Sequence, residues 1–262
     1  MTEILTIANQ KGGVGKTTTA VNLAGALAMK NKKVLLVDAD PQTNATTSLG
    51  FARDKYEKNL YQAMIGKQNI QDTILNTDIQ KLDLIPSSIG LVGFEKNYYT
   101  NKNKNKFVLK KLISEIKENY DYVIIDSPPA LGPLTINTLT ASTSVLIPIQ
   151  CEFFALEGLA LLLNTIKLIK QTTNPELKIK GFLPTMYAKN NNLSKQVLND
   201  LIQHFDSKLF KINKTSYIVV PRNITLAESP SFGKTVEQYD KNSTGSKAYR
   251  NLANTILKRK IS

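Results

Sequence analysis

The sequence predicts an α/β fold in which helices cover both faces of a mostly parallel central sheet. Apolar, β-branched runs of strand length recur along the chain, and helical patterns lie between most of them. The runs are continuously apolar rather than alternating, which is typical of strands buried on both faces. No repeat, linker or break in composition divides the 262 residues, so we expect a single domain over residues 1–262.

Seven strands and five helices are expected from these patterns. The strands are expected at residues 4–8, 33–38, 82–86, 122–126, 144–149, 179–186 and 217–220. The helices are expected at residues 20–27, 109–116, 155–169, 193–205 and 248–257, where apolar residues recur at helical spacing. Residues 155–169 are apolar nearly all round, which favours a buried helix over its alternative, a helix in a dimer interface.

Composition excludes several classes of protein. Cys151 is the only cysteine, so neither an intrachain disulfide nor an iron–sulfur cluster is expected, and a cytoplasmic setting fits. No apolar stretch approaches the roughly 20 residues that a membrane-spanning helix needs. The chain runs directly into its first apolar segment, which leaves no room for a signal peptide.

The chain is strongly basic, with 34 Lys and Arg against 21 Asp and Glu and a net charge of +13. Such an excess favours a polyanionic partner such as nucleic acid. Stretches that alternate asparagine and lysine, such as residues 101–106, also allow the simpler interpretation that composition has drifted. Charge alone leaves both interpretations open.

A glycine-rich turn lies between the first strand and the first helix, where phosphates bind. It reads Asn9-Gln10-Lys11-Gly12-Gly13-Val14-Gly15-Lys16-Thr17-Thr18. The glycines let backbone N–H groups converge on an anion, while Lys16 would reach the β- and γ-phosphates and Thr17 would bind Mg²⁺. Gln10 stands where a strict Walker A motif has its first glycine, and Lys11 is a second lysine at the mouth of the loop.

Carboxylates end two other predicted strands. Asp38 and Asp40 follow the second strand, and Asp126 ends the fourth, as a Walker B aspartate does. The carboxyl ends of parallel strands are where ligands bind in open α/β sheets. After Asp126, Pro128 and Pro129 stiffen a turn in which Gly132 is expected to act as a pivot, which suits a γ-phosphate sensor.

These motifs resemble those of the ParA/MinD ATPases. The segment from Lys11 to Thr18 resembles their deviant Walker A motif, residues 38–42 resemble switch I and residues 127–132 resemble switch II. Residues 221–234 resemble a further block of the family. The resemblance runs over nearly the whole chain, with the four motifs in family order, and implies a P-loop NTPase of the deviant Walker A type that binds ATP and Mg²⁺.

The resemblance also implies roles for individual residues. Lys11 would act across an ATP-sandwich homodimer, and Asp40 would position the hydrolytic water. Asp38 and Asp126 would support the Mg²⁺ shell through water. Pro221 and Asn223 would frame the adenine. The remaining nucleotide contacts are implied for Gly12, Gly13, Val14, Gly15, Lys16, Thr17 and Thr18.

By the same resemblance, we expect a weak, nucleoid-associated ATPase that drives chromosome or plasmid partition. ATP-bound dimers would bind DNA non-specifically, and a ParB-type partner would stimulate hydrolysis. Two arginines associated with DNA binding in the family are replaced here by Asn190 and Thr225. Nearby basic residues could compensate, because phosphate contacts need charge more than fixed geometry. The candidates are Lys189, Lys195, Arg222, Lys234, Lys247 and Arg250; a solvated basic face is the alternative.

Two other functions stay open. A MinD-like membrane-positioning ATPase would need a C-terminal amphipathic helix, and the only candidate is the stripe at Tyr249, Leu252, Ala253 and Ile256 with the basic residues 258–260 after it. That stripe equally suits a helix docked on the sheet, so membrane binding is not favoured. A ParA-like positioner of a protein cargo is not distinguished from a DNA-partitioning protein by the sequence.

Overall fold

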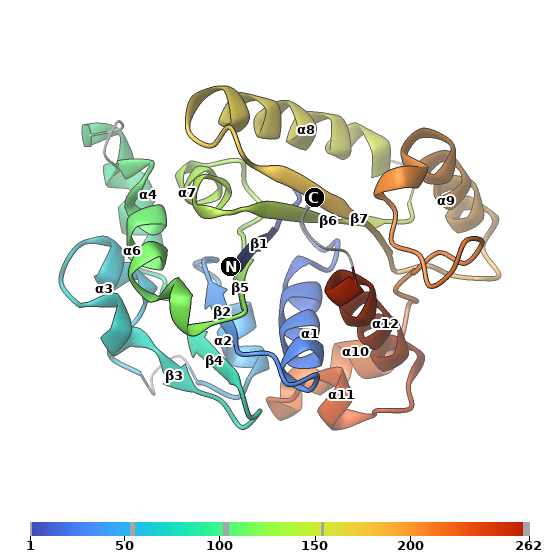
Figure 1. The fold of residues 1–262 in the computed structure, drawn as a ribbon, viewed down its shortest axis with the longest axis horizontal. Coiled ribbons are helices and arrows are strands. Elements are labelled where there is room, and N and C mark those ends of the chain that lie inside the picture. The colour runs from blue at the N-terminus through green and yellow to red at the C-terminus, as the bar shows by residue number, and fades with distance from the viewer. Residues whose placement is uncertain (1, 53–55, 102–104, 153–154, 259–262) are drawn as a thin grey trace.

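The computed structural model describes residues 2–52, 56–101, 105–152 and 155–258, and within them a seven-stranded sheet forms the centre of the molecule (Figure 1). The strand order is β3-β4-β2-β5-β1-β6-β7, and every pairing is parallel except β3 with β4. The strands are β1 (Glu3–Ile7), β2 (Val34–Asp38), β3 (Leu75–Asn76), β4 (Leu82–Ile85), β5 (Tyr122–Asp126), β6 (Ser144–Gln150) and β7 (Lys178–Thr185). The predicted α/β class is confirmed.

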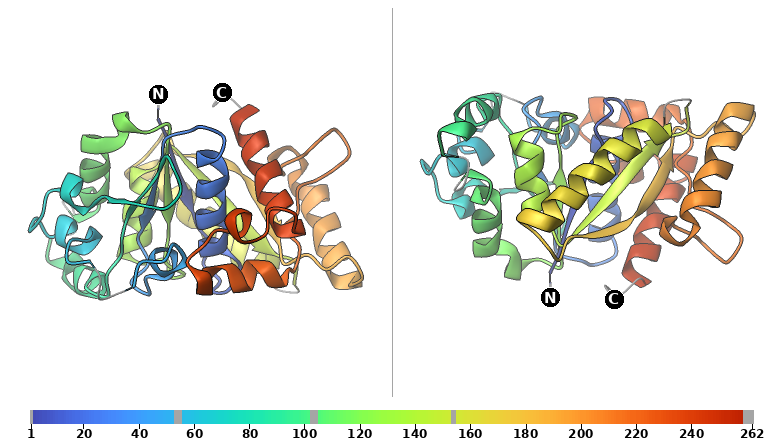
Figure 2. Two further views of the ribbon diagram at one scale, coloured as in Figure 1. Left: turned by 90° about the horizontal axis from the view of Figure 1, so that it is seen from below. Right: turned by 90° about the horizontal axis from the view of Figure 1, so that it is seen from above.

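Helices cover both faces of this sheet (Figures 1 and 2). One face carries α1 (Lys16–Ala28), α2 (Asn44–Ser48), α10 (Ile224–Glu228), α11 (Val236–Tyr239) and α12 (Thr244–Lys258). The other carries α3 (Leu60–Met64), α4 (Leu91–Asn97), α6 (Val108–Ile116), α7 (Pro133–Ala141), α8 (Ala155–Thr172) and α9 (Asn192–Phe205). Short 3₁₀ turns are η1 (Ile70–Thr73), η2 (Tyr98–Asn101), η3 (Lys117–Asn119), η4 (Asp206–Lys208) and η5 (Ser229–Phe232). All five predicted helices are present.

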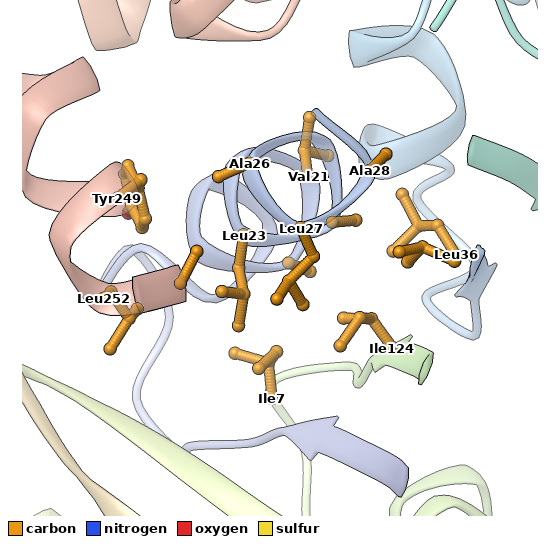
Figure 3. Close-up of a cluster of buried hydrophobic side chains, with 14 of the residues drawn as sticks. Ile7, Val21, Leu23, Ala26, Leu27, Ala28, Leu36, Ile124, Tyr249 and Leu252 are labelled. Carbon is orange, nitrogen blue, oxygen red and sulfur yellow. The ribbon is translucent and has the colours of Figure 1, made fainter. Parts of the chain in front are cut away.

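The alternation of side chains along the strands explains why both faces are apolar. Leu36 of β2 belongs to the core under α1, whereas its neighbours Leu35 and Val37 belong to the core on the opposite face. In the first core, Leu23 and Leu27 of α1 point toward the sheet between α12 and β2 (Figure 3). Burial of each such leucine contributes about 1.5–3 kcal/mol, so the sheet holds helices on both sides.

The C-terminal stripe is part of the core. Tyr249, Leu252, Ala253 and Ile256 of α12 are all buried against α1, and the Tyr249 hydroxyl lies 3.1 Å from the hydroxyl of Thr19. The stripe therefore docks on the body of the protein, as favoured from the sequence; basic residues 259–260 lie outside the described part of the chain. Among the described helices, none has the length and apolar character needed to cross a membrane.

One expected strand is absent, and one short strand in the sheet was not expected. Residues 217–220 form no regular strand: the N–H of Ile218 donates to the carbonyl of Phe210, whereas the N–H of Val220 donates to the carbonyl of Pro184 in β7. Pro184 and Pro221 carry no N–H group, so a continuous ladder cannot form there. The edge strand β3 was not expected, because two residues are too short to show a period.

The strand register brings the predicted site together. Ile7, which precedes the glycine-rich loop, is opposite Asp126, and Asp126 is in turn opposite Asp38. Three loops therefore leave the carboxyl edge of the sheet from adjacent strands, the position at which open α/β sheets bind ligands.

Candidate functional site

The loop between β1 and α1 has the shape of an anion cradle. Gly13 and Gly15 have φ angles of 72° and 85°, a left-handed conformation that other residues adopt only with strain. Gly12 does not have a positive φ. Asn9 fixes the loop, because its Nδ2 donates to the carbonyl of Pro148 at 2.6 Å and its Oδ1 accepts from the N–H of Lys11 at 3.1 Å. Among the described residues, no side chain caps the N-terminus of α1, so its first N–H groups are available to an anion.

Lys16 is buried at the start of α1, where its Nζ donates to the carbonyl of Lys11 at 3.0 Å. Burial lowers the pKa of Lys16, and the charges of Asp126 and Asp40 partly offset this effect. The loop therefore holds a desolvated ammonium group next to the anion cradle. Such a group is suited to neutralising a polyphosphate.

A cavity of about 310 Å³ lies in front of the loop. Its walls come from the glycine-rich loop, both predicted switch segments and the residue after β7: Gly12, Gly13, Gly15, Lys16, Thr17, Thr18, Asp40, Gln42, Asn44, Pro129 and Met186. Lys11 is not among these lining residues. Its side chain is 39% exposed, and its Nζ lies 3.8 Å from Oε2 of Glu152 at the end of β6. The second lysine therefore points away from the cavity of its own chain.

Asp38 organises the segment that follows β2. Its Oδ2 accepts from the N–H and the hydroxyl of Thr46 at 2.8 and 2.7 Å, and its Oδ1 accepts from the N–H of Asp40 at 3.1 Å. Burial raises the pKa of Asp38 to about 6, although these hydrogen bonds favour the charged form. Asp38 thus holds the first turn of α2 against the strand edge.

Asp126 has the environment expected of a residue that faces a bound cation. It is fully buried, and neither carboxylate oxygen has a hydrogen-bond partner among the described residues. Burial and the charge of Asp38 raise the pKa of Asp126 well above the usual range, and the charge of Lys16 acts in the opposite direction. An unpaired buried carboxylate is costly unless a cation or a cation-bound water faces it, so the group fits Mg²⁺.

Asp40 lies at the cavity, where its side chain and its backbone carbonyl each have a different hydrogen-bond partner. Its Oδ1 accepts from the N–H of Gln42 at 2.9 Å, while its carbonyl accepts from the hydroxyl of Ser87 at 2.6 Å. Ser87 follows β4 and also donates its N–H to the Thr46 hydroxyl at 3.1 Å. Asp40 is buried but lines the cavity, so its free carboxylate oxygen is available to a water molecule there.

The segment after Asp126 includes Gly132, the residue expected to act as a pivot. Gly132 has a φ of −97° and a ψ of −169°, which any residue can adopt, so conformational freedom does not explain it. A Cβ atom at this position would instead lie 2.9 Å from Oε1 of Glu95 on α4. The carboxylate of Glu95 therefore lies close to Gly132 beside the N-terminus of α7, and the expected pivot at Gly132 stays a prediction.

A second cavity of about 240 Å³ lies at the other end of the glycine-rich loop. Pro221, Arg222 and Asn223 line it together with Gly15, Thr18 and Tyr249. The Asn223 side chain is already engaged, since its Oδ1 accepts from the N–H of Leu226 and its Nδ2 donates to Thr244. One proton of the Asn223 Nδ2 group stays available in this cavity, and the roles expected of Pro221 and Asn223 toward a base stay predictions.

The six basic candidates fall into two groups. Lys189, Lys195, Lys234 and Lys247 are exposed on loops and helices of the C-terminal half. The two arginines already have acidic partners: Arg222 lies 3.4 Å from Glu152, and Arg250 lies 2.7 Å from Glu237. Arg222 thus belongs to the nucleotide side of the molecule.

Four residues of the site were missed by sequence reasoning: Asn9, Thr46, Ser87 and Glu152. Asn9 adjoins the loop and its type suits a backbone clamp, so it could have been found. Thr46 and Ser87 act through hydroxyls far apart in sequence, and Glu152 follows a strand without a recognisable pattern. Only the fold brings these three together.

Comparison with known proteins gives consistent matches. A family model described as an AAA domain matches residues 2–179. The chain is 45% identical over 256 residues to the sporulation initiation inhibitor protein Soj of Bacillus subtilis, covering 98% of both chains. It is 44% identical over 258 residues to the chromosome partitioning protein ParA of Caulobacter vibrioides, covering 98% of this chain and 94% of that one.

A solved structure extends the likeness to the fold. The chain matches cobyrinic acid a,c-diamide synthase from Mycobacterium smegmatis, determined with a bound ATP analogue and magnesium, with a TM-score of 0.83 and 34% identity. The match covers 98% of this chain and 95% of that one.

Proposed function

Because the chain belongs to the Soj/ParA family of chromosome-partitioning ATPases, we propose that it binds Mg²⁺ and ATP between two copies of itself and partitions DNA. The observation that carries this proposal is that the two lysines of the loop differ in burial and direction. Lys16 is buried against the phosphate cradle, whereas Lys11 is half exposed and points away from it.

In this proposal the cradle holds the triphosphate. N–H groups of the loop and of the first turn of α1 would contact its oxygens, with Lys16 at the β- and γ-phosphates. The Thr17 hydroxyl would bind Mg²⁺ directly, and Asp126 would hold Mg²⁺-bound water with its two unpaired oxygens. Mg²⁺ would supply charge neutralisation at the phosphates. Asp38 would support this shell indirectly, by fixing Thr46 and Asp40.

Hydrolysis would require the second protomer. Asp40 lines the cavity, where its carboxylate would orient the attacking water. Lys11 of each protomer would reach the nucleotide of the facing protomer and stabilise charge on the leaving group, as a trans-acting arginine finger does. To do so, it would leave the 3.8 Å contact with Glu152, which is half exposed and costs about 0–1 kcal/mol to break.

The nucleotide-bound dimer would bind DNA non-specifically through its basic surface, and a ParB-type protein would stimulate hydrolysis and release it. Lys189, Lys195, Lys234 and Lys247 are the exposed DNA-binding candidates. Arg222 and Arg250 are weaker candidates because each is paired with a glutamate. The protein would act as a single domain in the cytoplasm, on the nucleoid. The MinD-like alternative loses its support because the α12 stripe is buried in the core.

The test is binding to a duplex of arbitrary sequence over a series of salt concentrations, with and without ATP. We expect ATP-dependent binding that weakens steeply with salt, since each neutralised phosphate contributes a slope of about −0.9. Lys16→Ala, which should not load nucleotide, is the control. Binding that is equal without ATP, or nearly independent of salt, would contradict DNA binding by an ATP-loaded dimer.

A further inference from the structure

Ser87 lies near the phosphate cavity without lining it. It follows β4, which pairs with β2 in the sheet (Figure 1), and Val37 of β2 lies opposite Ile85 of β4. The segments that leave these two strands therefore run side by side, one carrying Asp40 and the other Ser87. Ser87 is fully buried and is not among the residues that line the cavity. Any effect of Ser87 on a bound nucleotide must therefore pass through another residue.

The cavity residue that Ser87 contacts is Asp40. The Ser87 hydroxyl donates to the carbonyl of Asp40 at 2.6 Å, and the N–H of Asp40 donates to Oδ1 of Asp38 at 3.1 Å. These two hydrogen bonds hold the peptide planes on both sides of the Asp40 Cα atom. Because peptide groups are planar, holding both planes also fixes the direction in which the Asp40 side chain leaves the backbone.

These contacts belong to a closed ring of hydrogen bonds. Thr46 donates its N–H and its hydroxyl to Oδ2 of Asp38 at 2.8 and 2.7 Å, and the Thr46 hydroxyl oxygen accepts from the N–H of Ser87 at 3.1 Å. The ring therefore runs from Asp38 through Thr46 and Ser87 to the carbonyl of Asp40, and returns through the N–H of Asp40 to Asp38. All four residues are buried, and hydrogen bonds are stronger in such a low-dielectric interior than in water.

This ring leaves one carboxylate oxygen of Asp40 for a ligand. Its Oδ1 accepts from the N–H of Gln42 at 2.9 Å, whereas no described residue donates to its Oδ2. Since Asp40 lines the cavity, Oδ2 is the atom that would accept a hydrogen bond from the attacking water. A displacement of about 1 Å in such a group can lower a reaction rate about 100-fold, so the direction of this side chain matters.

Two other serines offer matched comparisons. Ser142 is 3% exposed, and its hydroxyl donates to the carbonyl of Thr138 at 2.7 Å at the end of α7. Ser88 follows Ser87 in the chain, and its hydroxyl accepts from the N–H of Gly90 at 3.2 Å. Neither of these described serines lines the phosphate cavity or has a hydrogen bond to Asp40. Ser142 thus matches Ser87 in burial and in the kind of hydrogen bond, and Ser88 matches it in position along the chain.

We propose that Ser87 is a positioning residue for ATP hydrolysis, which holds the carbonyl of Asp40 and thereby aims the Asp40 carboxylate at the attacking water. This inference rests on the role proposed above for Asp40. Without the Ser87 hydroxyl, the peptide group after Asp40 loses its buried partner, and the side chain is free to turn. The glycine-rich loop and Lys16 are untouched by this change. The rate of hydrolysis should therefore fall, whereas the affinity for ATP should stay the same.

The test compares wild type, Ser87→Ala, Ser87→Cys and Asp40→Ala in the full chain. Hydrolysis of ATP with Mg²⁺ is followed in single turnovers with protein in excess, and the affinity for ATP is measured by equilibrium titration. We expect Ser87→Ala to lower the rate constant of hydrolysis about tenfold, because the carboxylate is no longer aimed. Its affinity for ATP should stay within about twofold of wild type, since the phosphate contacts remain. Ser87→Cys, whose thiol is a weaker donor, should have an intermediate rate constant.

The matched controls are Ser142→Ala and Ser88→Ala, which should hydrolyse ATP at the wild-type rate, and thermal unfolding checks that all variants fold. If Asp40→Ala is as fast as wild type, the role of Asp40, and this inference with it, is wrong. If Asp40→Ala is slow but Ser87→Ala is as fast as wild type, only the positioning role is wrong. An equally slow Ser142→Ala, or a loss of ATP affinity in Ser87→Ala, would show a general structural effect and also overturn the proposal. If Ser87→Ala does not fold, the same criteria apply to Ser87→Cys.

Discussion

The buried carboxylates that we propose to support Mg²⁺ should destabilise the protein when no nucleotide is bound. Asp38 and Asp126 are adjacent in register and fully buried, with Lys16 and Asp40 as the other charged groups facing Asp126. Both have pKa values raised by burial, that of Asp38 from 3.8 to about 6. The folded state therefore binds protons more tightly than the unfolded chain. The free energy of unfolding should fall as pH rises through this range.

The size of the effect follows from Asp38. A difference of about 2 pKa units corresponds to about 3 kcal/mol that is lost between roughly pH 4 and pH 6. The loss continues toward neutral pH because the pKa of Asp126 lies higher. For a chain of this size, 3 kcal/mol corresponds to a shift in Tm of roughly 6–12 °C. Mg²⁺ with ATP should reverse the loss, since the cation stabilises the charged carboxylates.

The assay is thermal or urea unfolding of the nucleotide-free protein between pH 5 and pH 8, for wild type and Asp126→Asn. The variant removes a buried carboxylate and its repulsion on Asp38, so it should be more stable than wild type at pH 8 and vary less with pH. It should also lose the Mg²⁺-dependent part of nucleotide binding. A wild-type stability that is constant or increases over this range, or an equal slope in Asp126→Asn, would refute the reasoning.

Three further predictions concern the phosphate cradle. Lys16→Ala should abolish ATP binding in equilibrium titration, because the desolvated ammonium at the phosphates is lost; near-normal affinity would defeat the assignment. Asp40→Ala should bind ATP but hydrolyse it slowly and accumulate on DNA as the ATP-bound dimer, whereas rapid turnover would exclude Asp40 as the water-positioning residue. Gly15→Ala should destabilise the protein by about 1–2 kcal/mol because its φ is 85°. The control is Gly12→Ala, since Gly12 has no positive φ and a Cβ atom there would have no neighbour within 4 Å. In the same unfolding experiment, Gly12→Ala should lower the free energy of unfolding clearly less than Gly15→Ala does.

Much of the fold could be predicted because its signals are local. Six of the seven expected strands are present in the structure, and their apolar runs are visible in the sequence; the helices repeat their apolar residues at helical spacing. Residues 217–220 have the same apolar character, but Pro221 after them and Pro184 in β7 lack the N–H groups that a continuous ladder needs. The strand β3 is held by two residue pairs, Leu75 with Leu84 and Asn76 with Asp83, and this pairing depends on tertiary contacts.

The site likewise has residues that could be located from the sequence and contacts that could not. Lys16, Asp40 and Asp126 could be located from the loop and the strand ends, because strand order alone brings them to one edge. The contacts that orient them could not be predicted, since Ser87 reaches the carbonyl of Asp40 across 47 positions of sequence. Gly132 shows a further limit. The sequence suggests a pivot there, whereas the structure gives it ordinary backbone angles and places the carboxylate of Glu95 beside it.

The most direct test of the central claim mixes two inactive variants, Lys11→Ala and Asp40→Ala, and measures ATP hydrolysis. If Lys11 acts on the nucleotide of the facing protomer, a mixed dimer has one complete site, with Asp40 from one chain and Lys11 from the other. Random pairing of equal amounts makes half of the dimers mixed, so we expect up to about one quarter of the wild-type rate. If Lys11 acts within its own chain, every site in every dimer lacks one residue. A mixture as inactive as its two components would therefore contradict the account.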